Sequence, residues 1–277
     1  MELYDQISYE FSRSLTRRYS TSFSLGIHML DSKFHKSIYA IYGFVRIADE
    51  IVDTFHEHDK EKLFNRFCDD TYLALDQKIS TNPILNAFQD TVNRFDIDRN
   101  LIDAFLKSMR MDLSLSDCNE NTYKEYIYGS AEVVGLMCLK VFCQDEIHSY
   151  EKLTTPARQL GSAFQKINFL RDFKSDFADR GRIYFPGIDF TNFTNEQKTE
   201  IENDIENEFK QAWNGVIQLP KGSKLGVMVA YIYYLTLFKK IKLIPAARIK
   251  EERIRVNNLH KIALLVQTWF RYKLKLV

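Results

Sequence analysis

Glycine and proline are scarce in this chain of 277 residues, with 10 and 5 occurrences. Both residues interrupt regular elements, so a chain that has few of them makes few tight turns. This scarcity argues against a fold of many short strands and favours long helices. The apolar fraction of 45% is that of an ordinary globular protein with a sizeable core.

Neither sign of charge is in excess, because 38 Lys and Arg oppose 37 Asp and Glu. This balance provides no overall basic surface, and nucleic acid is not expected as a partner. There are only four cysteines and no Cys-x-x-Cys pair, and the first ten residues lack the basic and apolar regions of a signal peptide. We therefore expect buried thiols and a cytoplasmic location.

Long hydrophobic runs are missing as well. The longest run, Leu225–Phe238, has 14 residues. A helix needs about 20 apolar residues to span a bilayer. The run is therefore expected to be a buried core helix.

Apolar residues recur with the period of a helix along almost the whole chain. This spacing predicts helices over residues 5–18, 32–55, 59–79, 83–94, 98–114, 121–143, 150–178, 194–216, 223–242 and 249–273. Residues 179–194 are expected to form a loop, and Pro156 is expected in the first turn of its helix. No linker or solenoid repeat divides the chain, so we predict one all-α domain over residues 1–277.

One apolar helix carries a polar stripe. The stripe consists of Tyr42, Arg46, Asp49 and Asp53, at offsets of 0, 4, 7 and 11. At about 100° per residue these positions fall within an arc of about 60°. The two aspartates are one turn apart, about 6 Å along the axis.

A second helix repeats the pattern. Its stripe consists of Gln165, Asn168, Asp172 and Asp176, at offsets of 0, 3, 7 and 11. These positions span an arc of about 80°. Carboxylates one turn apart repel each other, and the cost rises on burial unless a cation compensates.

Mg²⁺ is a suitable cation for such stripes. It prefers oxygen ligands and usually takes one or two carboxylates, completing its shell with water and phosphate oxygens. Two facing stripes could hold Mg²⁺ ions that bind a diphosphate, while Arg46 and Arg171 neutralise phosphate oxygens. A single Asp-x-x-x-Asp pair usually marks a solvated helix face. Two stripes with matched spacing make a metal site a stronger alternative, but spacing alone still favours the solvated face.

Four segments resemble the signature blocks of the squalene/phytoene synthases, which join prenyl diphosphates head to head. They are "YSTSFSLGIHML", "AIYGFVRIADEIVD", "YIYGSAEVVG" and "LGSAFQKINFLRDFKSDFADRGRIYFP". The resemblance covers about residues 15–190 and continues weakly to the end. It implies an all-α class I isoprenoid synthase fold, a helical bundle around a central cavity. It also implies dependence on Mg²⁺, which Mn²⁺ could replace.

The resemblance also assigns roles to residues. The implied metal ligands are Asp49, Asp53, Asn168, Asp172 and Asp176. The implied catalytic residues are Tyr42, Arg46, Tyr128, Gln165 and Tyr184. The expected substrate-binding residues are Ser20, Ser22, Phe23, Arg46, Gln165, Asn168, Arg171 and Arg182.

The resemblance favours a bacterial phytoene synthase that uses two geranylgeranyl diphosphates and no NADPH. Dehydrosqualene or squalene from two farnesyl diphosphates is the alternative. A terpene cyclase and a non-catalytic member of the family are weaker alternatives, because both aspartate pairs and the "YSTSF" segment are present. No particular oligomeric state is predicted.

The C-terminal segment, residues 261–277, is basic and amphipathic. It could lie on a membrane surface, which would make the protein peripheral, or it could cap the domain. Arg255 and Lys261, just before and within this segment, either reach a diphosphate or belong to a solvated basic face. His56–Asp59 is expected to be a solvated turn despite its metal-binding residue types. Glu132 is expected to make a core hydrogen bond, with a catalytic role as the alternative.

Overall fold

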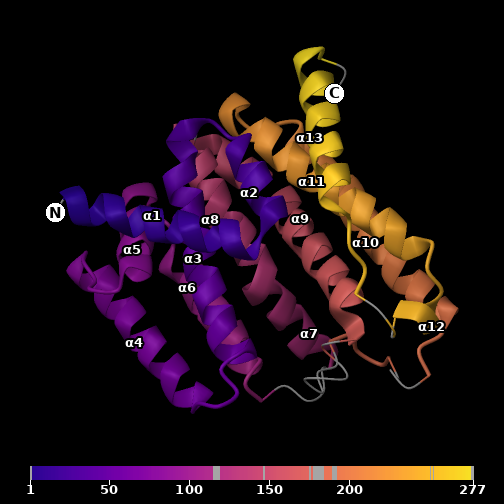
Figure 1. Cartoon of the computed structure of the whole chain (residues 1–277), viewed down its shortest axis with the longest axis horizontal. Coiled ribbons are helices and arrows are strands. Elements are labelled where there is room, and N and C mark those ends of the chain that lie inside the picture. The colour runs from indigo at the N-terminus through magenta and orange to yellow at the C-terminus, as the bar shows by residue number, and fades with distance from the viewer. Residues whose placement is uncertain are drawn as a thin grey trace.

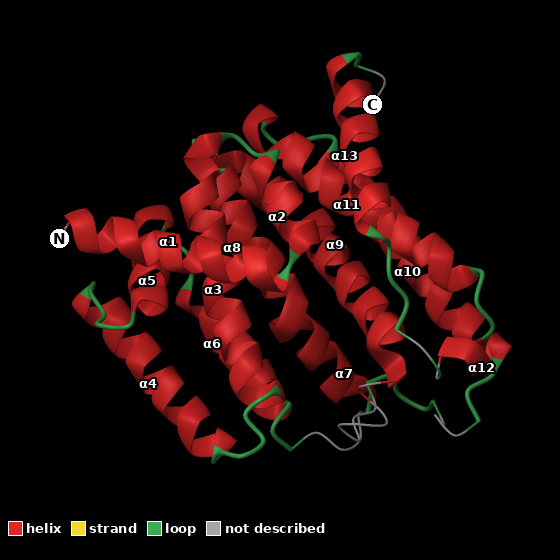
Figure 2. Cartoon of the chain, viewed as in Figure 1, coloured by secondary structure: helices red, strands yellow, loops and turns green. Residues whose placement is uncertain are grey.

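A computed structural model of the chain describes residues 2–114, 119–145, 147–174, 176, 184–188, 192–249, 251 and 253–275. Every regular element in these residues is a helix (Figure 2). The predicted all-α class is therefore confirmed. Among the described residues, none of the helices combines the length and hydropathy required to cross a bilayer.

The helices are α1 (Glu2–Tyr19), α2 (Thr21–His28), α3 (Ser32–Asp53), α4 (Lys60–Gln77), α5 (Pro83–Phe95), α6 (Arg99–Met111), α7 (Glu120–Ile127), the π-helical segment η1 (Tyr128–Glu132), α8 (Val133–Phe142), α9 (Ile147–Lys174), α10 (Asn195–Val216), α11 (Lys221–Lys242), α12 (Ala246–Ile249) and α13 (Asn258–Lys273). Most of them agree with the predicted ranges to within a few residues. The expected buried helix over Leu225–Phe238 is part of α11, and Met228, Tyr234 and Leu237 are among its buried residues.

Four features differ from the sequence prediction. Helix α2 was not predicted; it begins after Ser20, whose side chain accepts a hydrogen bond from the backbone N–H of Phe23. The predicted helix 121–143 is interrupted by η1. The predicted helix 249–273 is divided by a non-helical stretch before Asn257, which caps α13. Pro156 lies inside α9 and not in its first turn, because α9 already begins at Ile147.

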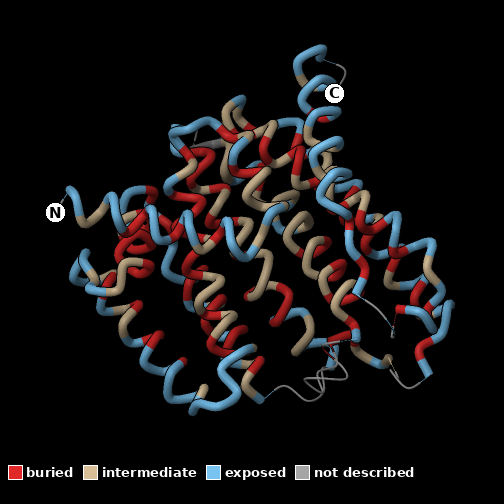
Figure 3. The backbone as a smooth tube through the Cα atoms, viewed as in Figure 1, coloured by how far each residue is buried: buried red, intermediate tan, exposed pale blue. Residues whose placement is uncertain are grey.

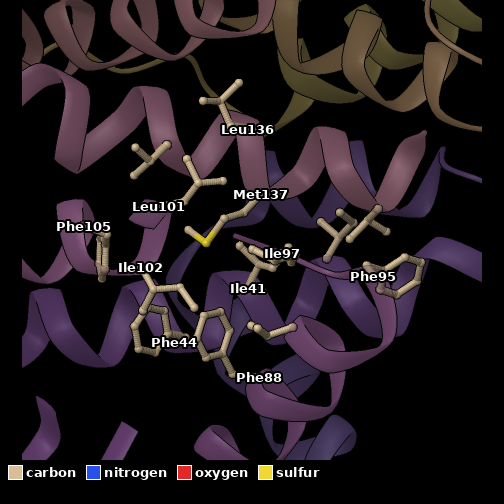
Figure 4. Packing of buried hydrophobic residues seen from close by; sticks show 14 of the residues in the cluster. Ile41, Phe44, Phe88, Phe95, Ile97, Leu101, Ile102, Phe105, Leu136 and Met137 are labelled. Carbon is tan, nitrogen blue, oxygen red and sulfur yellow. The ribbon is translucent and has the colours of Figure 1, made fainter. Parts of the chain in front are cut away.

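Two hydrophobic clusters hold the helices together. In the first, the ring of Phe44 on α3 stacks on Phe88 of α5 at a centroid distance of 3.8 Å, and Phe105 of α6 lies 5.2 Å from it (Figure 4). The second cluster joins α9, α10 and α11, and Leu170 and Leu237 are among its fully buried residues. Assignment of residues 1–277 to one domain stays a prediction.

Helices α3 and α9 share a neighbour, α8. Helix α8 packs against α3 and against α9, and η1 packs between α6 and α9. Helix α2 lies against α11, and α13 lies along α11 and extends to the C-terminus (Figure 1). The two helices that carry the polar stripes are thus neighbours of the same central segment, and a cavity lies between them.

Candidate active site

Helix α3 contributes one wall of a polar cavity of about 440 Å³. One side of α3 is buried in the first hydrophobic cluster through residues such as Phe44 and Val52. The other side presents the predicted stripe, and all four of its members line the cavity: Tyr42, Arg46, Asp49 and Asp53. The period of the helix separates core residues from cavity residues, as the stripe predicted.

Helix α9 contributes a second wall. Its predicted stripe lines the same cavity with Gln165, Asn168, Asp172 and Asp176. Asp176 is itself buried, and Asp172 is mostly buried. The structure therefore brings the two aspartate pairs to one cavity, although they are more than a hundred residues apart in sequence.

Arg46 is held by acids of its own helix. One guanidinium nitrogen lies 2.6 Å from a carboxylate oxygen of Asp49, and another pairs with Glu50. Burial alone would lower the pKa of Arg46, but Asp49 and Glu50 outweigh burial and raise it, so the group stays charged. Tyr19 lies against the guanidinium at 4.3 Å from ring centroid to Cζ. The Nε of Arg46 is buried and has no hydrogen-bond partner within the described part of the chain.

Two arginines hold Asp172. The Nε of Arg171 lies 3.0 Å from one carboxylate oxygen, and the Nε of Arg253 lies 2.6 Å from the same oxygen. Burial lowers the pKa of Arg171, but the adjacent carboxylate raises it further than burial lowers it. Arg253 comes from the stretch between α12 and α13 and was not predicted, because no helical spacing connects it to either stripe.

A chain of neutral polar groups runs beside the second stripe. The hydroxyl of Tyr234 donates to Asn168 Oδ1 at 3.2 Å, and Asn168 Nδ2 donates to Gln165 Oε1 at 3.4 Å. The ring of Tyr234 stacks on Phe164 at 3.8 Å. Burial raises the pKa of Tyr234 to about 12, so its hydroxyl stays protonated at neutral pH. Tyr234 was also missed by sequence reasoning, because it lies on α11, away from both stripes.

The start of α2 forms an edge of the cavity, where the predicted residues Ser20, Ser22 and Phe23 are all found. Ser20 caps α2, with 3.2 Å between its hydroxyl oxygen and the Phe23 nitrogen. The adjacent Thr21 accepts a hydrogen bond of 2.8 Å from the ammonium group of Lys261 on α13. Desolvation, aided by Arg171 and Arg255, lowers the pKa of Lys261.

Tyr184 lies in the cavity as predicted, beside two residues that were not predicted. Its hydroxyl donates to Asp112 Oδ1 at 3.2 Å, and the hydroxyl of Tyr126 donates to Asp112 Oδ2 at 2.8 Å. All three residues line the polar cavity. Desolvation and the nearby Asp112 raise the pKa of Tyr126 well above its ordinary value.

Tyr128 does not line the cavity. Its ring lies under the guanidinium of Arg158 at 5.1 Å and packs against the first hydrophobic cluster. Positions two apart on a helix point about 200° apart, so Tyr126 and Tyr128 cannot both face the cavity. The expectation that Tyr128 lies near the reacting carbons therefore has no support in this geometry. Glu132, expected to bond within the core, instead pairs with Arg158 at 2.6 Å. Arg182 lies outside the described residues.

An apolar chamber of about 320 Å³ continues from the polar cavity. The two share seven lining residues, namely Phe23, Tyr42, Val45, Ser130, Gln165, Asn168 and Tyr234. Along α9 the chamber extends from Asn168 to Leu153, fifteen residues or about 22 Å of helix. The adjoining wall follows η1 and α8 from Ser130 to Phe142. An elongated apolar chain attached to a charged head group would match this shape.

The residues of the cavity fit a magnesium diphosphate. Within the described residues, no group of three or more His, Cys, Asp and Glu side chains is close enough to hold a metal ion. Asp49, Asp53, Asn168, Asp172 and Asp176 line this cavity with carboxylate and amide oxygens, the type of ligand that Mg²⁺ prefers when phosphate oxygens complete its shell. Two polar atoms of residues that line the cavity, the Nε of Arg46 and the hydroxyl of Ser130, are buried without a hydrogen-bond partner in the described residues. Both could donate to an anion.

Comparison with known proteins gives consistent results. A sequence profile described as "Squalene/phytoene synthase" matches residues 16–259. The chain is 28% identical to the 4,4'-diapophytoene synthase of Staphylococcus haemolyticus, over 71% of this chain and 68% of that protein. It is 30% identical to the phytoene synthase of Arthrospira platensis, over 76% and 71% of the two chains. Among solved structures, a dehydrosqualene synthase with a bound ligand has a TM-score of 0.81 at 21% identity, over 97% of this chain and 98% of that chain, which is a likeness of fold.

Proposed function

The chain belongs to the squalene/phytoene synthase family, and from this premise we propose that it joins two geranylgeranyl diphosphates to make phytoene. Membership makes it a prenyltransferase that acts on prenyl diphosphates through Mg²⁺-dependent chemistry. In the proposed reaction, one substrate loses its diphosphate and the double bond of the other attacks the allylic cation. The resulting cation loses a proton as a cyclopropane ring closes, which gives prephytoene diphosphate. A second ionisation, rearrangement and proton loss then give phytoene, so no NADPH is required.

The observation that carries the proposal is the joined cavity, polar at one end and apolar at the other. Diphosphate departure needs positive charge and hydrogen-bond donors at the leaving group. The carbocation that remains needs surroundings without water, because water would capture it. Tyr42, Gln165 and Asn168 line both parts, so they lie where the head group of a substrate would meet its chain.

At the polar end, Asp49 and Asp53 would hold metal from α3, and Asp172 and Asp176 with Asn168 would hold it from α9. Mg²⁺, or Mn²⁺ in its place, supplies positive charge that stabilises the departing diphosphate. Arg46 and Arg171 would donate to phosphate oxygens, since the pKa of each is raised and both stay charged. Ser20 and Ser22 would border the same diphosphate from the start of α2.

At the apolar end, aromatic rings would face the cation. Phe23 lies 5.8 Å from Tyr42 and 6.1 Å from Tyr234, measured between ring centroids. These rings line both parts of the cavity, and aromatic faces attract cations. The hydroxyls of Tyr42 and Tyr184 and the amide of Gln165 are the polar groups proposed to act near the reacting carbons.

The choice of geranylgeranyl over farnesyl substrate is supported by the phytoene synthase of Arthrospira platensis, which is 30% identical to this chain. The length of the apolar chamber, about 22 Å of helix, agrees with a long prenyl chain. One observation favours the alternative: the Staphylococcus haemolyticus relative, 28% identical, is a 4,4'-diapophytoene synthase. The second candidate is therefore condensation of two farnesyl diphosphates to dehydrosqualene.

A product assay tests both candidates. Purified protein is incubated with Mg²⁺ and either geranylgeranyl or farnesyl diphosphate, with and without NADPH, and the extracted hydrocarbons are identified. Phytoene from the longer substrate without NADPH is the expected result. Dehydrosqualene from farnesyl diphosphate alone would overturn the substrate assignment and leave the mechanism intact. A folded protein that binds diphosphate and couples neither substrate would overturn the proposed function.

A further inference from the structure

Helix α13 directs an apolar face away from the rest of the protein. The exposed fractions of its large hydrophobic side chains lie between 38% and 82%, for Leu259, Ile262, Val266, Trp269, Phe270 and Leu274. At about 100° per residue these six positions fall within an arc of about 140°. We call this set the outer face of α13. Figure 3 shows α13 mostly in the colour of exposed residues.

The opposite face of α13 already attaches the helix to the protein. Helix α13 packs along α11, with Thr268 buried and Leu265 half-buried. The ammonium group of Lys261 reaches Thr21 on α2 and lies 5.5 Å from the ring centroid of Tyr233. A helix that only capped the domain would place polar residues outward. The outer face is therefore left for another surface to cover.

The charge of the region indicates what that surface is. Residues 253–275 contain six basic residues and no Asp or Glu: Arg253, Arg255, Lys261, Arg271, Lys273 and Lys275. The ammonium group of Lys273 lies 5.9 Å from the ring of Trp269, beside the outer face. Exposed aliphatic and aromatic side chains in a segment whose charged residues are all basic match the interface of an anionic bilayer.

We propose that the outer face of α13 docks the protein on an anionic lipid surface. The helix would lie in the interface plane, with the apolar face among the acyl chains and Arg271, Lys273 and Lys275 at the head groups. A second copy of the chain fits the same face less well. A symmetric contact between two outer faces would bring the basic groups of both copies together, and like charges oppose such a contact.

The position of α13 links this surface to the cavity. Through Lys261, its first turn contacts Thr21, and the neighbours Ser20, Ser22 and Phe23 line the polar cavity. Docking would therefore hold the cavity close to the lipid surface. A hydrocarbon product could then pass from the cavity into the bilayer. This use of the docked position, unlike docking itself, rests on the proposed function.

Vesicle flotation tests the docking. Full-length protein is mixed with vesicles of phosphatidylcholine alone or with added phosphatidylglycerol, at low and high salt. The expected result is flotation with the anionic vesicles that high salt weakens. The double variant Ile262→Ser/Phe270→Ser should partition onto the anionic vesicles at least about tenfold more weakly, because it removes two side chains that insert into the interface. The matched control Leu63→Ser/Leu73→Ser changes two exposed residues of α4 and should float like the unsubstituted protein.

Several outcomes would overturn the proposal. One is failure of the unsubstituted protein to float with anionic vesicles. Another is equal flotation of the α13 variant, with circular dichroism showing both variants folded. If sedimentation showed a dimer that the α13 substitutions dissociate, and the dimer did not float, a second copy would cover the face instead. A product assay in detergent separates the two proposals, since flotation without hydrocarbon formation would reject only the function.

Discussion

The polar and apolar parts of the cavity share seven residues but are organised by different interactions. In the polar part, charged groups are held by opposite charges, as Arg46 is by Asp49 and Asp172 is by Arg171 and Arg253. The apolar part is lined mostly by aliphatic and small residues, and its shape depends on how closely α8 and α9 approach. Charge balance therefore determines how the side chains of the polar part are arranged, and side-chain volume determines the shape of the apolar part.

This difference predicts which kind of substitution each part tolerates. A change of charge without a change of shape should act strongly at the polar end, where the surroundings exclude much of the water that would screen it. A change of volume without a change of charge should act strongly at the apolar end, because packed interiors do not absorb extra atoms freely. Each prediction below changes one property and holds the other nearly constant.

The largest effect is expected from Asp172→Asn. The substitution keeps the shape but removes the charge that holds Arg171 and Arg253 and that would bind Mg²⁺. We expect the rate of product formation to fall by about 100-fold to 1,000-fold, with the protein still folded. Rates measured over a range of Mg²⁺ concentrations check this. Asp76→Asn is the matched control, because Asp76 on α4 forms an exposed pair with Arg99 at the start of α6. Full activity of the Asp172 variant would contradict the view that charge balance governs the polar part of the cavity.

A volume change at the apolar end should come next. Gly161 on α9 faces η1 so closely that an added Cβ would lie 2.7 Å from the backbone oxygen of Ala131. Gly161→Ala should lower the free energy of unfolding by about 1–3 kcal/mol, because backbone cannot move aside as a side chain can. Urea unfolding measures it.

Gly135→Ala provides the graded control for the same helix pair. Its Cβ would lie 3.1 Å from the backbone oxygen of Ala157, so a smaller loss is expected. Equal losses for the two variants, or none, would contradict the view that the approach of η1 and α8 to α9 determines the shape of the chamber.

Tyr234, which lines both parts, predicts a dependence of stability on pH. Burial raises its pKa from 10.0 to about 12, so the fold favours the protonated hydroxyl. This contribution is present in full below pH 10 and is lost as the pH rises towards 12. At pH 11 the loss should be about 1 kcal/mol.

Urea unfolding of the unsubstituted protein and of Tyr234→Phe, at pH 8 and pH 11, checks the pH effect. The variant loses its hydrogen bond to Asn168 at both pH values, so only the difference between the two values is informative. That difference should be smaller in the variant by about 1 kcal/mol. An unchanged difference would mean that the Tyr234 hydroxyl ionises as easily in the folded protein as in the unfolded chain.

The two parts also differ in how far sequence reasoning could find them. Charged residues at helical spacing inside apolar segments are unusual, so the stripes containing Asp49 and Asp172 could be predicted from periodicity alone. Asp112 and Arg253 could not, because each reaches the cavity from an element outside the stripes. Tyr126 was missed because only the orientation of its helix distinguishes it from Tyr128.

The apolar chamber was not predictable residue by residue. Its walls use residues such as Leu153 and Val134, which are also the commonest residues of a core. An aliphatic side chain that faces a cavity has the same helical spacing as one that packs against a neighbour. The long helices and their order were nevertheless predictable, because each needs only a local period. The breaks at η1 and before α13 depend on packing between helices.

The smallest effect is expected at the boundary between the two parts, from Ser130→Ala. The hydroxyl of Ser130 is buried and has no hydrogen-bond partner within the described part of the chain. Removing it should leave the free energy of unfolding unchanged to within about 0.5 kcal/mol, or raise it, since no bond is lost. Urea unfolding without substrate measures this.

If the hydroxyl of Ser130 donates to the diphosphate, the same variant should bind inorganic diphosphate with Mg²⁺ more weakly. A hydroxyl that contributes nothing to folding and something to binding belongs functionally to the polar part, although apolar residues surround it. Loss of about 1 kcal/mol of stability without a change in binding would place it with the apolar packing instead.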